Sequence, residues 1–196
     1  MENRTTTFQQ TNAFAMQYGV LLGAFGLLTL AVFVLSFQFQ SLGILTDLMF
    51  LGSPFLATYF TLRFRKTVMV PEFGFTFGRA FGFTFFMGIY ATLWVALGVF
   101  VYLNFFDGGY LFDKIEEVIS SPQFVAQLRQ AGSWDMIIDQ YGSLPKMVNV
   151  LRSISPAEYA GGVIYMSLLI APVISCVIAL VARKSADMWI MPKSQK

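Results

Sequence analysis

Four long apolar stretches, separated by polar segments, dominate the pattern of this sequence. They lie at residues 18–37, 44–62, 80–104 and 159–182, and no charged residue occurs between Arg4 and Asp47, Arg79 and Asp107, or Glu158 and Arg183. A helix needs about 20 apolar residues to cross roughly 30 Å of hydrocarbon. In lipid, a helix also pairs its own backbone donors and acceptors, whereas an open strand edge does not. The pattern predicts an all-α membrane protein whose four transmembrane helices form a single domain, residues 1–196.

The polar segment between the third and fourth stretches, residues 107–158, has a helical period of its own. Ser121-Pro122 and Ser143-Leu144-Pro145 interrupt it as helix breaks. We expect two or three short amphipathic helices, which either cap the bundle or lie at the membrane interface. Apolar residues recur at the i, i+3, i+4 spacing in Ile115, Val118, Ile119, Phe124, Val125, Leu128, Met147, Val148 and Leu151.

The start of the fourth transmembrane helix is marked by Ser155-Pro156-Ala157-Glu158. A serine N-cap, a proline at the first helical position and a glutamate at the third form a capping box. The first apolar stretch is longer than the 7–15 residues of a signal-peptide core, and no small-x-small cleavage site follows Ser36. We therefore expect the first helix to remain in the mature protein.

Positive charges are distributed unevenly between the two predicted faces of the membrane. One face carries most of them: Arg4, Arg63, Arg65, Lys66, Arg79, Arg183, Lys184, Lys193 and Lys196. The other carries four basic residues, Lys114, Arg129, Lys146 and Arg152, among the acids Asp107, Asp113, Glu116, Glu117, Asp135, Asp139 and Glu158. Because basic loops resist translocation, the sequence predicts that both termini are cytoplasmic and that residues 107–158 lie outside.

Composition narrows the range of functions. Hydrophobic residues make up 56% of the chain and charged residues 12%, against roughly 25% in soluble domains. The net charge of +2 argues against a nucleic-acid partner, which needs clustered Lys and Arg. Without His, and with Cys176 as the single cysteine, the usual transition-metal ligand sets are missing. We expect no cofactor, no metal and no catalytic residues, and we interpret Cys176 as a small packing residue.

Asp47 is the one acidic residue close to a membrane stretch that invites a functional hypothesis. An ionisable group within a span can carry protons or act as a counter-ion. The alternative is that Asp47, about one turn from the boundary, is reached by water and favoured by the positive end of the helix dipole.

Glycines recur at every fourth position in two places. Gly74, Gly78 and Gly82 precede and open the third span, and Gly19 and Gly23 lie in the first. This spacing clears one helix face, so that another backbone can approach closely. It predicts either a contact with a second copy or another membrane protein, or ordinary packing within the chain. A phosphate-binding loop is excluded, because no strand precedes the glycines and no Lys followed by Ser or Thr comes after them.

Prolines and phenylalanines give weaker signals. Pro54 and Pro172 lie inside the second and fourth spans and are expected to kink them. Kinked helices line substrate sites in some transporters but are also common in inert bundles. The phenylalanines around the start of the third span predict lipid-facing and interfacial packing rather than a ligand cage: Phe73, Phe75, Phe77, Phe81, Phe83, Phe85 and Phe86.

Four features together resemble an uncharacterised bacterial membrane family, domain of unknown function 4199, found mostly in Bacteroidetes. They are the glycine-bearing first span, Arg63-Phe64-Arg65-Lys66 after the second, Gly74-Phe75-Thr76-Phe77-Gly78-Arg79-Ala80-Phe81 before the third, and the amphipathic segment before the fourth. The resemblance covers nearly the whole chain. It implies the same topology, with no activity and no site residues to carry over.

Three functional hypotheses follow. The first is a non-enzymatic accessory or assembly factor of the bacterial inner membrane, acting through helix contacts and the outer segment on a membrane-protein partner or a second copy. The second is a small oligomeric transporter or channel with Asp47 near its pathway. The third, an enzyme acting on lipid, requires two acids of the outer segment to converge on one pocket.

Overall fold

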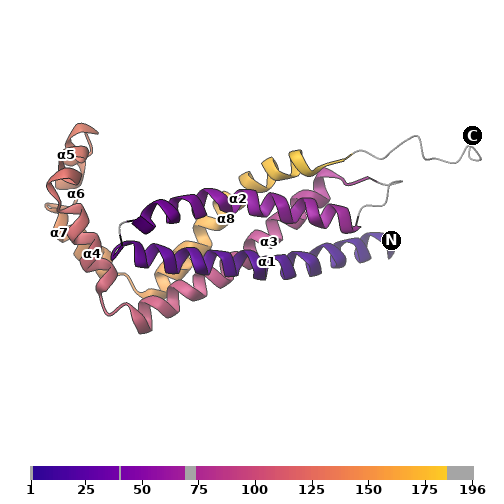
Figure 1. Ribbon diagram of the computed structural model, residues 1–196, viewed down its shortest axis with the longest axis horizontal. Coiled ribbons are helices and arrows are strands. Elements are labelled where there is room, and N and C mark those ends of the chain that lie inside the picture. The colour runs from indigo at the N-terminus through magenta and orange to yellow at the C-terminus, as the bar shows by residue number, and fades with distance from the viewer. Residues whose placement is uncertain (1, 40, 69–73, 185–196) are drawn as a thin grey trace, which may run out of the picture. The chain divides into compact units, whose positions relative to one another are not determined.

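The computed structural model describes residues 2–39, 41–68 and 74–184, which form eight α-helices and one short π-helix (Figure 1). Four helical segments are long and apolar enough to cross a membrane: Phe8–Ser36, Ser41–Val68, Phe77–Phe106 and Pro156–Ala182. The predicted all-α protein with four membrane helices is therefore confirmed. The helices themselves are α1 (Glu2–Ser36), α2 (Ser41–Val68), α3 (Phe77–Val101), the π-helix η1 (Tyr102–Phe106), α4 (Tyr110–Ile119), α5 (Pro122–Gln130), α6 (Trp134–Tyr141), α7 (Leu144–Ser153) and α8 (Pro156–Ala182).

The helices extend beyond the predicted apolar stretches. Helix α1 begins at Glu2, although hydrophobicity marks its span only from residue 18. Apolar residues report where lipid surrounds a helix, whereas the backbone hydrogen bonds continue into polar turns such as Gln9-Gln10. Span boundaries and helix boundaries are thus two different quantities.

The chain forms two compact units. The four-helix unit comprises residues 1–96 and 162–196 and contains α1, α2 and most of α3 and α8; the short-helix unit comprises residues 97–161. In the four-helix unit, the chain direction alternates from one helix to the next. Gln10 of α1 bonds Arg79 in the first turn of α3, and Arg65 near the end of α2 bonds Ala182 at the end of α8. The start of α1, the end of α2, the start of α3 and the end of α8 therefore share one end of this unit, here called the basic end.

A short antiparallel bridge joins the chain before α3 to the chain after α8. The amide of Phe75 donates to the carbonyl of Lys184 at 2.8 Å, and the amide of Lys184 donates back at 2.9 Å. Gly74 precedes the bridge with φ +65°, a left-handed conformation that glycine adopts at little cost. Its predicted place in a helix-packing stripe is wrong, because it lies before α3 and serves the turn.

Aromatic rings fill the core at the basic end. The rings of Phe64 and Phe83 stack with centroids 4.1 Å apart, and Phe75 packs edge-on against Phe64 at 5.8 Å. All three side chains are buried. The expectation that the phenylalanines are lipid-facing is therefore wrong for Phe75 and Phe83, while Phe77 is exposed and Phe73 lies outside the described residues.

The short-helix unit contains four helices, α4 to α7, rather than the two or three expected. The missed break is at Gly132, with φ +70°, between α5 and α6. The two predicted breaks are confirmed, since the hydroxyls of Ser121 and Ser143 accept the amides of Phe124 and Lys146 as N-caps. Buried Phe112, Ile119, Leu144 and Val148 form the core of this unit.

The capping box at the start of α8 is confirmed atom by atom. The amide of Ser155 donates to the Glu158 carboxylate at 2.8 Å, and the amide of Glu158 donates to the Ser155 hydroxyl at 3.3 Å. Helix α8 begins at Pro156, as the motif predicts.

Candidate functional site

The glycines of α1 form a close seam with α3. A Cβ added at Gly19 would lie 2.5 Å from the Cβ of Tyr90, and one added at Gly23 would lie 2.8 Å from the Cβ of Trp94. Gly26, which the fourth-position spacing misses, continues the seam: its added Cβ would lie 2.5 Å from a methyl group of Val95. In the first span, packing within the chain is therefore the correct interpretation.

The glycines of α3 behave differently. A Cβ added at Gly78 or Gly82 meets nothing within 4 Å. Beside them, Phe77, Phe81 and Phe85 form a stacked row with centroids 6.1 and 5.9 Å apart. Together, Gly78, Gly82 and this row form the glycine face of α3, where open space lies beside stacked aromatic rings.

Side-chain hydrogen bonds connect α3 to each of its neighbours in the four-helix unit. The hydroxyls of Thr61 in α2 and Thr84 in α3 lie 2.9 Å apart, and both side chains are buried. Thr92 donates to Ser167 of α8 at 2.8 Å. On the remaining side, Tyr90 donates to Asn12 of α1 at 2.9 Å. These bonds satisfy polar groups that lipid cannot solvate, so a structural role is sufficient to explain the polar side chains.

Asp47 lies in the second turn of α2, past the first turn in which a helix dipole favours an acid. Its side chain is exposed and makes no ion pair with a described residue. Its neighbours Ile44, Leu48 and Leu51 are also exposed. The carboxylate therefore stands on an outward apolar face, away from the interior of its own unit.

A shallow apolar groove of about 280 Å³ lies between α2 and α8. Its walls come from one side of each helix: Pro54, Phe55, Thr58, Val173, Ile174, Val177 and Ile178. Proline lacks an N–H and leaves the carbonyl four residues earlier without its helical partner. The hydroxyl of Ser53 donates to that carbonyl, of Phe50, at 2.9 Å. The backbone freed by Pro54 is therefore not available to coordinate an ion.

At the basic end, two arginines hold neighbouring helices together. Arg65 donates to the Ala182 carbonyl at 2.9 Å, and Arg79 donates to the Gln10 side chain at 2.7 Å. The Arg79 guanidinium also lies 5.7 Å from the ring centroid of Phe64, within cation–π range. Its Nε is buried and has no hydrogen-bond partner among the described residues. Lys193 and Lys196, which contribute to the predicted charge asymmetry, lie outside the described residues.

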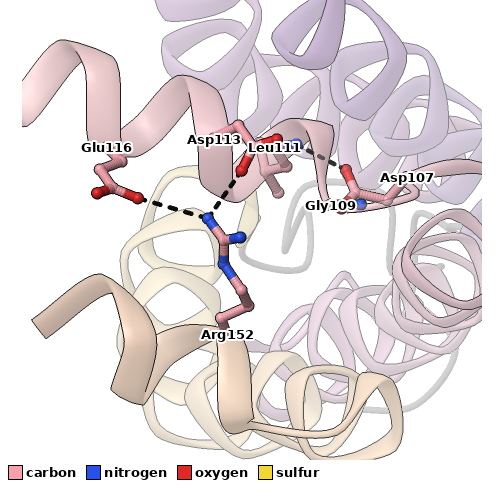
Figure 2. Close-up of polar contacts among 6 residues, drawn as sticks. All are labelled: Asp107, Gly109, Leu111, Asp113, Glu116 and Arg152. Atoms are coloured by element: carbon pink, nitrogen blue, oxygen red, sulfur yellow. Dashed lines mark hydrogen bonds and ion pairs between the residues drawn. The ribbon is translucent and has the colours of Figure 1, made fainter. Parts of the chain in front are cut away.

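In the short-helix unit, a second hollow of about 180 Å³ is lined by residues that include Asp107, Arg152 and Tyr159. Asp107 is 5% exposed, and its two carboxylate oxygens accept the amides of Gly109 and Leu111 at 3.1 and 2.9 Å (Figure 2). Asp107 thus caps the start of α4, so its oxygens are already occupied by structural bonds.

Arg152 of α7 bridges two acids of α4. It lies 2.8 Å from Asp113 and 3.5 Å from Glu116, and Figure 2 shows its guanidinium between the two carboxylates. On the same helix, Glu117 bonds Lys114 at 2.6 Å and raises the pKa of that ammonium group. Among the residues that line this hollow, Asp107 is the only acid.

Three further findings concern Cys176, the possible metal ligands and Arg152. Cys176 is exposed on α8, so its interpretation as a packing residue is wrong. No group of three or more His, Cys, Asp or Glu that could hold a metal ion occurs within residues 2–39, 41–68 and 74–184. Sequence reasoning missed Arg152 as a link to α4, since no local spacing signals a contact between side chains so far apart in the chain.

Comparison with known protein families identifies a match over most of the chain. The profile of a family described as "Protein of unknown function (DUF4199)" matches residues 17–184. No curated protein and no solved structure matches this chain.

Proposed function

This chain belongs to the DUF4199 family of proteins of unknown function, and on that premise we propose that it is a non-enzymatic accessory or assembly factor of the bacterial inner membrane. It acts by binding a membrane-protein partner or a second copy through α3 and through the short-helix unit. The proposal includes a multi-pass topology with both termini in the cytoplasm and residues 107–158 outside.

The observation that carries the proposal is the contrast between the two sets of glycines. The space beside Gly19, Gly23 and Gly26 is occupied by residues of α3. In contrast, Gly78 and Gly82 have open space beside a stacked aromatic row. Without a hydrophobic driving force between helices in lipid, association depends on close van der Waals packing, which small residues permit. Open space at two glycines next to a row of aromatic rings suits a partner helix.

The short-helix unit supplies a second kind of contact surface. Val118, Met136 and Val150 are exposed on three of its helices, with 69% of Met136 accessible. Exposed apolar side chains on a segment with its own core suit recognition by another protein. The basic side chains Arg63, Arg65, Lys66, Arg79, Arg183 and Lys184 support the orientation, since they all belong to segments at the basic end of the four-helix unit.

The test is a comparison of companions purified with the full chain from native membranes in mild detergent. Gly82→Leu places a bulky side chain in the open space on the glycine face of α3 and should reduce a stoichiometric companion, or the second copy, at least about tenfold. Gly52→Leu is the matched control, because a Cβ at Gly52 in α2 also meets nothing within 4 Å. Equal recovery with both variants, or no stoichiometric companion with wild type, contradicts the proposal.

The rival function is a small oligomeric transporter or channel, favoured by one observation, the exposed Asp47 on an apolar face of α2. In that case, Asp47 would line a path between copies, because it is absent from the linings of the two hollows described above and its side chain is exposed. Flux measurements on purified protein in liposomes distinguish transport from the accessory role. Proton- or cation-coupled flux that disappears in Asp47→Asn supports transport and overturns the accessory role.

A further inference from the structure

We propose that the groove between α2 and α8 binds one acyl chain of an anionic phospholipid whose phosphate is held by Arg65 at the basic end. The inference is independent of the proposed function, since it concerns the isolated chain and needs no protein partner.

The groove suits an apolar occupant. Apart from Thr58, its walls are hydrocarbon side chains, and the Thr58 hydroxyl already donates to the Pro54 carbonyl at 2.8 Å. The Phe50 carbonyl that Pro54 frees is taken by Ser53. A polar ligand would find no partner in the groove, whereas an acyl chain gains contacts with both helices.

Arg65 stands where the headgroup of such a lipid would be. It follows Pro54 by about three helical turns, and Thr58 by about two, so it returns to the groove side of α2. The rise from Thr58 to Arg65 is about 10 Å, and half of a bilayer's hydrocarbon core is about 15 Å. A chain anchored at Arg65 therefore passes the groove within one leaflet.

The guanidinium is oriented yet keeps free capacity. One of its five N–H groups bonds the Ala182 carbonyl at the end of α8, which fixes the side chain across the α2–α8 gap. No other hydrogen bond joins Arg65 to a described residue. Planar guanidinium groups bind phosphate through two parallel N–H bonds, and basic pockets between membrane helices recognise anionic headgroups.

The surrounding charge is complementary to an anion. Arg183 follows Ala182, whose carbonyl Arg65 binds, and its side chain is exposed at the same end. Among the side chains that the structure describes in the four-helix unit, Asp47 is the single acid, and it lies toward the opposite end of α2. A phosphate at Arg65 meets cations and no described carboxylate.

The test measures lipid retained by the purified full chain, using native mass spectrometry. Phosphatidylglycerol should bind at one site at least about fivefold more tightly than phosphatidylcholine with the same acyl chains, the factor that about 1 kcal/mol per cation gives. Glycerol phosphate, which has the headgroup without the chains, should not displace it. Equal binding of the two lipids, or displacement by glycerol phosphate, overturns the proposal.

Two pairs of variants separate the site from general surface charge. Arg65→Gln, which keeps a donor for the Ala182 carbonyl, should lose about fivefold in affinity, whereas Arg63→Gln, on the opposite side of α2, should not. Val177→Trp fills the groove and should expel the lipid, whereas Leu180→Trp, exposed on α8 outside the groove, should retain it. Equal losses within either pair overturn the proposal, and the tryptophan pair decides even if Arg65→Gln fails to fold.

Discussion

At the residue scale, a single methyl group decides whether α1 and α3 can meet. The Cβ that alanine would add at Gly19 lies 2.5 Å from the Cβ of Tyr90 and 3.1 Å from the Met87 carbonyl oxygen. Neither neighbour is the flexible end of a side chain, so relief requires the two helices to separate. The same methyl group at Gly52 in α2 meets open space.

We predict that Gly19→Ala lowers the free energy of unfolding by about 1–3 kcal/mol, the usual cost of overpacking. Gly52→Ala should be neutral or stabilising by up to about 1 kcal/mol, because alanine favours the helix more than glycine does. Unfolding of detergent-solubilised protein by added SDS, followed by circular dichroism, measures both. If the two variants shift the midpoint equally, the seam is not close-packed.

Asp107 is the residue whose role the sequence hides. Its buried carboxylate accepts two backbone amides at the start of α4. We predict that Asp107→Ala lowers the local stability of α4 by about 1.5–3 kcal/mol, the range for bonds to a charged group. Amide hydrogen exchange at Leu111 reports the loss. Gln127→Ala, at an exposed side chain of α5, is the control and should leave that exchange unchanged.

Local signals therefore predicted some residues and not others. The capping box at Ser155 and Glu158 is contained in four consecutive positions, so the sequence displays it in full. The roles of Gly78 and Cys176 depend on which helix lies opposite them, and that information is absent from a single helix. Gly26 was missed because it lies three residues after Gly23, whereas the sequence analysis considered only glycines four residues apart. Its contact with α3 was visible only in the structure.

At the element scale, the hydroxyl pair of Thr61 and Thr84 is the buried polar link between α2 and α3. Each hydroxyl also lies 2.9 Å from a carbonyl of its own helix, Ala57 or Ala80. Each threonine has one hydrogen to donate. One hydroxyl must therefore donate to the other, while the other donates back to its own helix.

We predict that Thr61→Val and Thr84→Val each destabilise the protein and that their effects are not additive. Interhelical hydrogen bonds in membrane proteins average about 0.6 kcal/mol, with a maximum near 1.7. The double-mutant cycle should give a coupling energy within that range. Thr67→Val at the exposed end of α2 provides the reference. A coupling energy of zero means that the two hydroxyls act separately.

Element types could be predicted better than element boundaries. All four membrane helices follow from the length and purity of their apolar stretches, because lipid leaves few other ways to satisfy the backbone. The break at Gly132 escaped prediction since it has no proline, unlike the breaks at Ser121-Pro122 and Ser143-Leu144-Pro145. A glycine with positive φ ends a helix without leaving a strong sequence signal.

At the scale of the whole molecule, the sequence predicted how many times the chain crosses the membrane but not which helices bond one another. Arg65 with Ala182 and Thr92 with Ser167 join positions that are distant in the sequence, and no periodicity links them. Charge distribution, in contrast, is a property of the complete chain, and it predicts one orientation for all four helices at once.

That orientation is tested by labelling single cysteines with a membrane-impermeant maleimide in a Cys176→Ser background. Ala126→Cys, exposed on α5, should react in intact spheroplasts, whereas Thr67→Cys, exposed at the end of α2, should react only after the membrane is permeabilised. Each cation carried outward against a potential of 100 mV costs about 2.3 kcal/mol, so transferring Arg63, Arg65 and Lys66 together is strongly opposed. If Thr67→Cys reacts in intact spheroplasts and Ala126→Cys reacts only after permeabilisation, the basic end lies outside. The proposed lipid site would then lie in the outer leaflet.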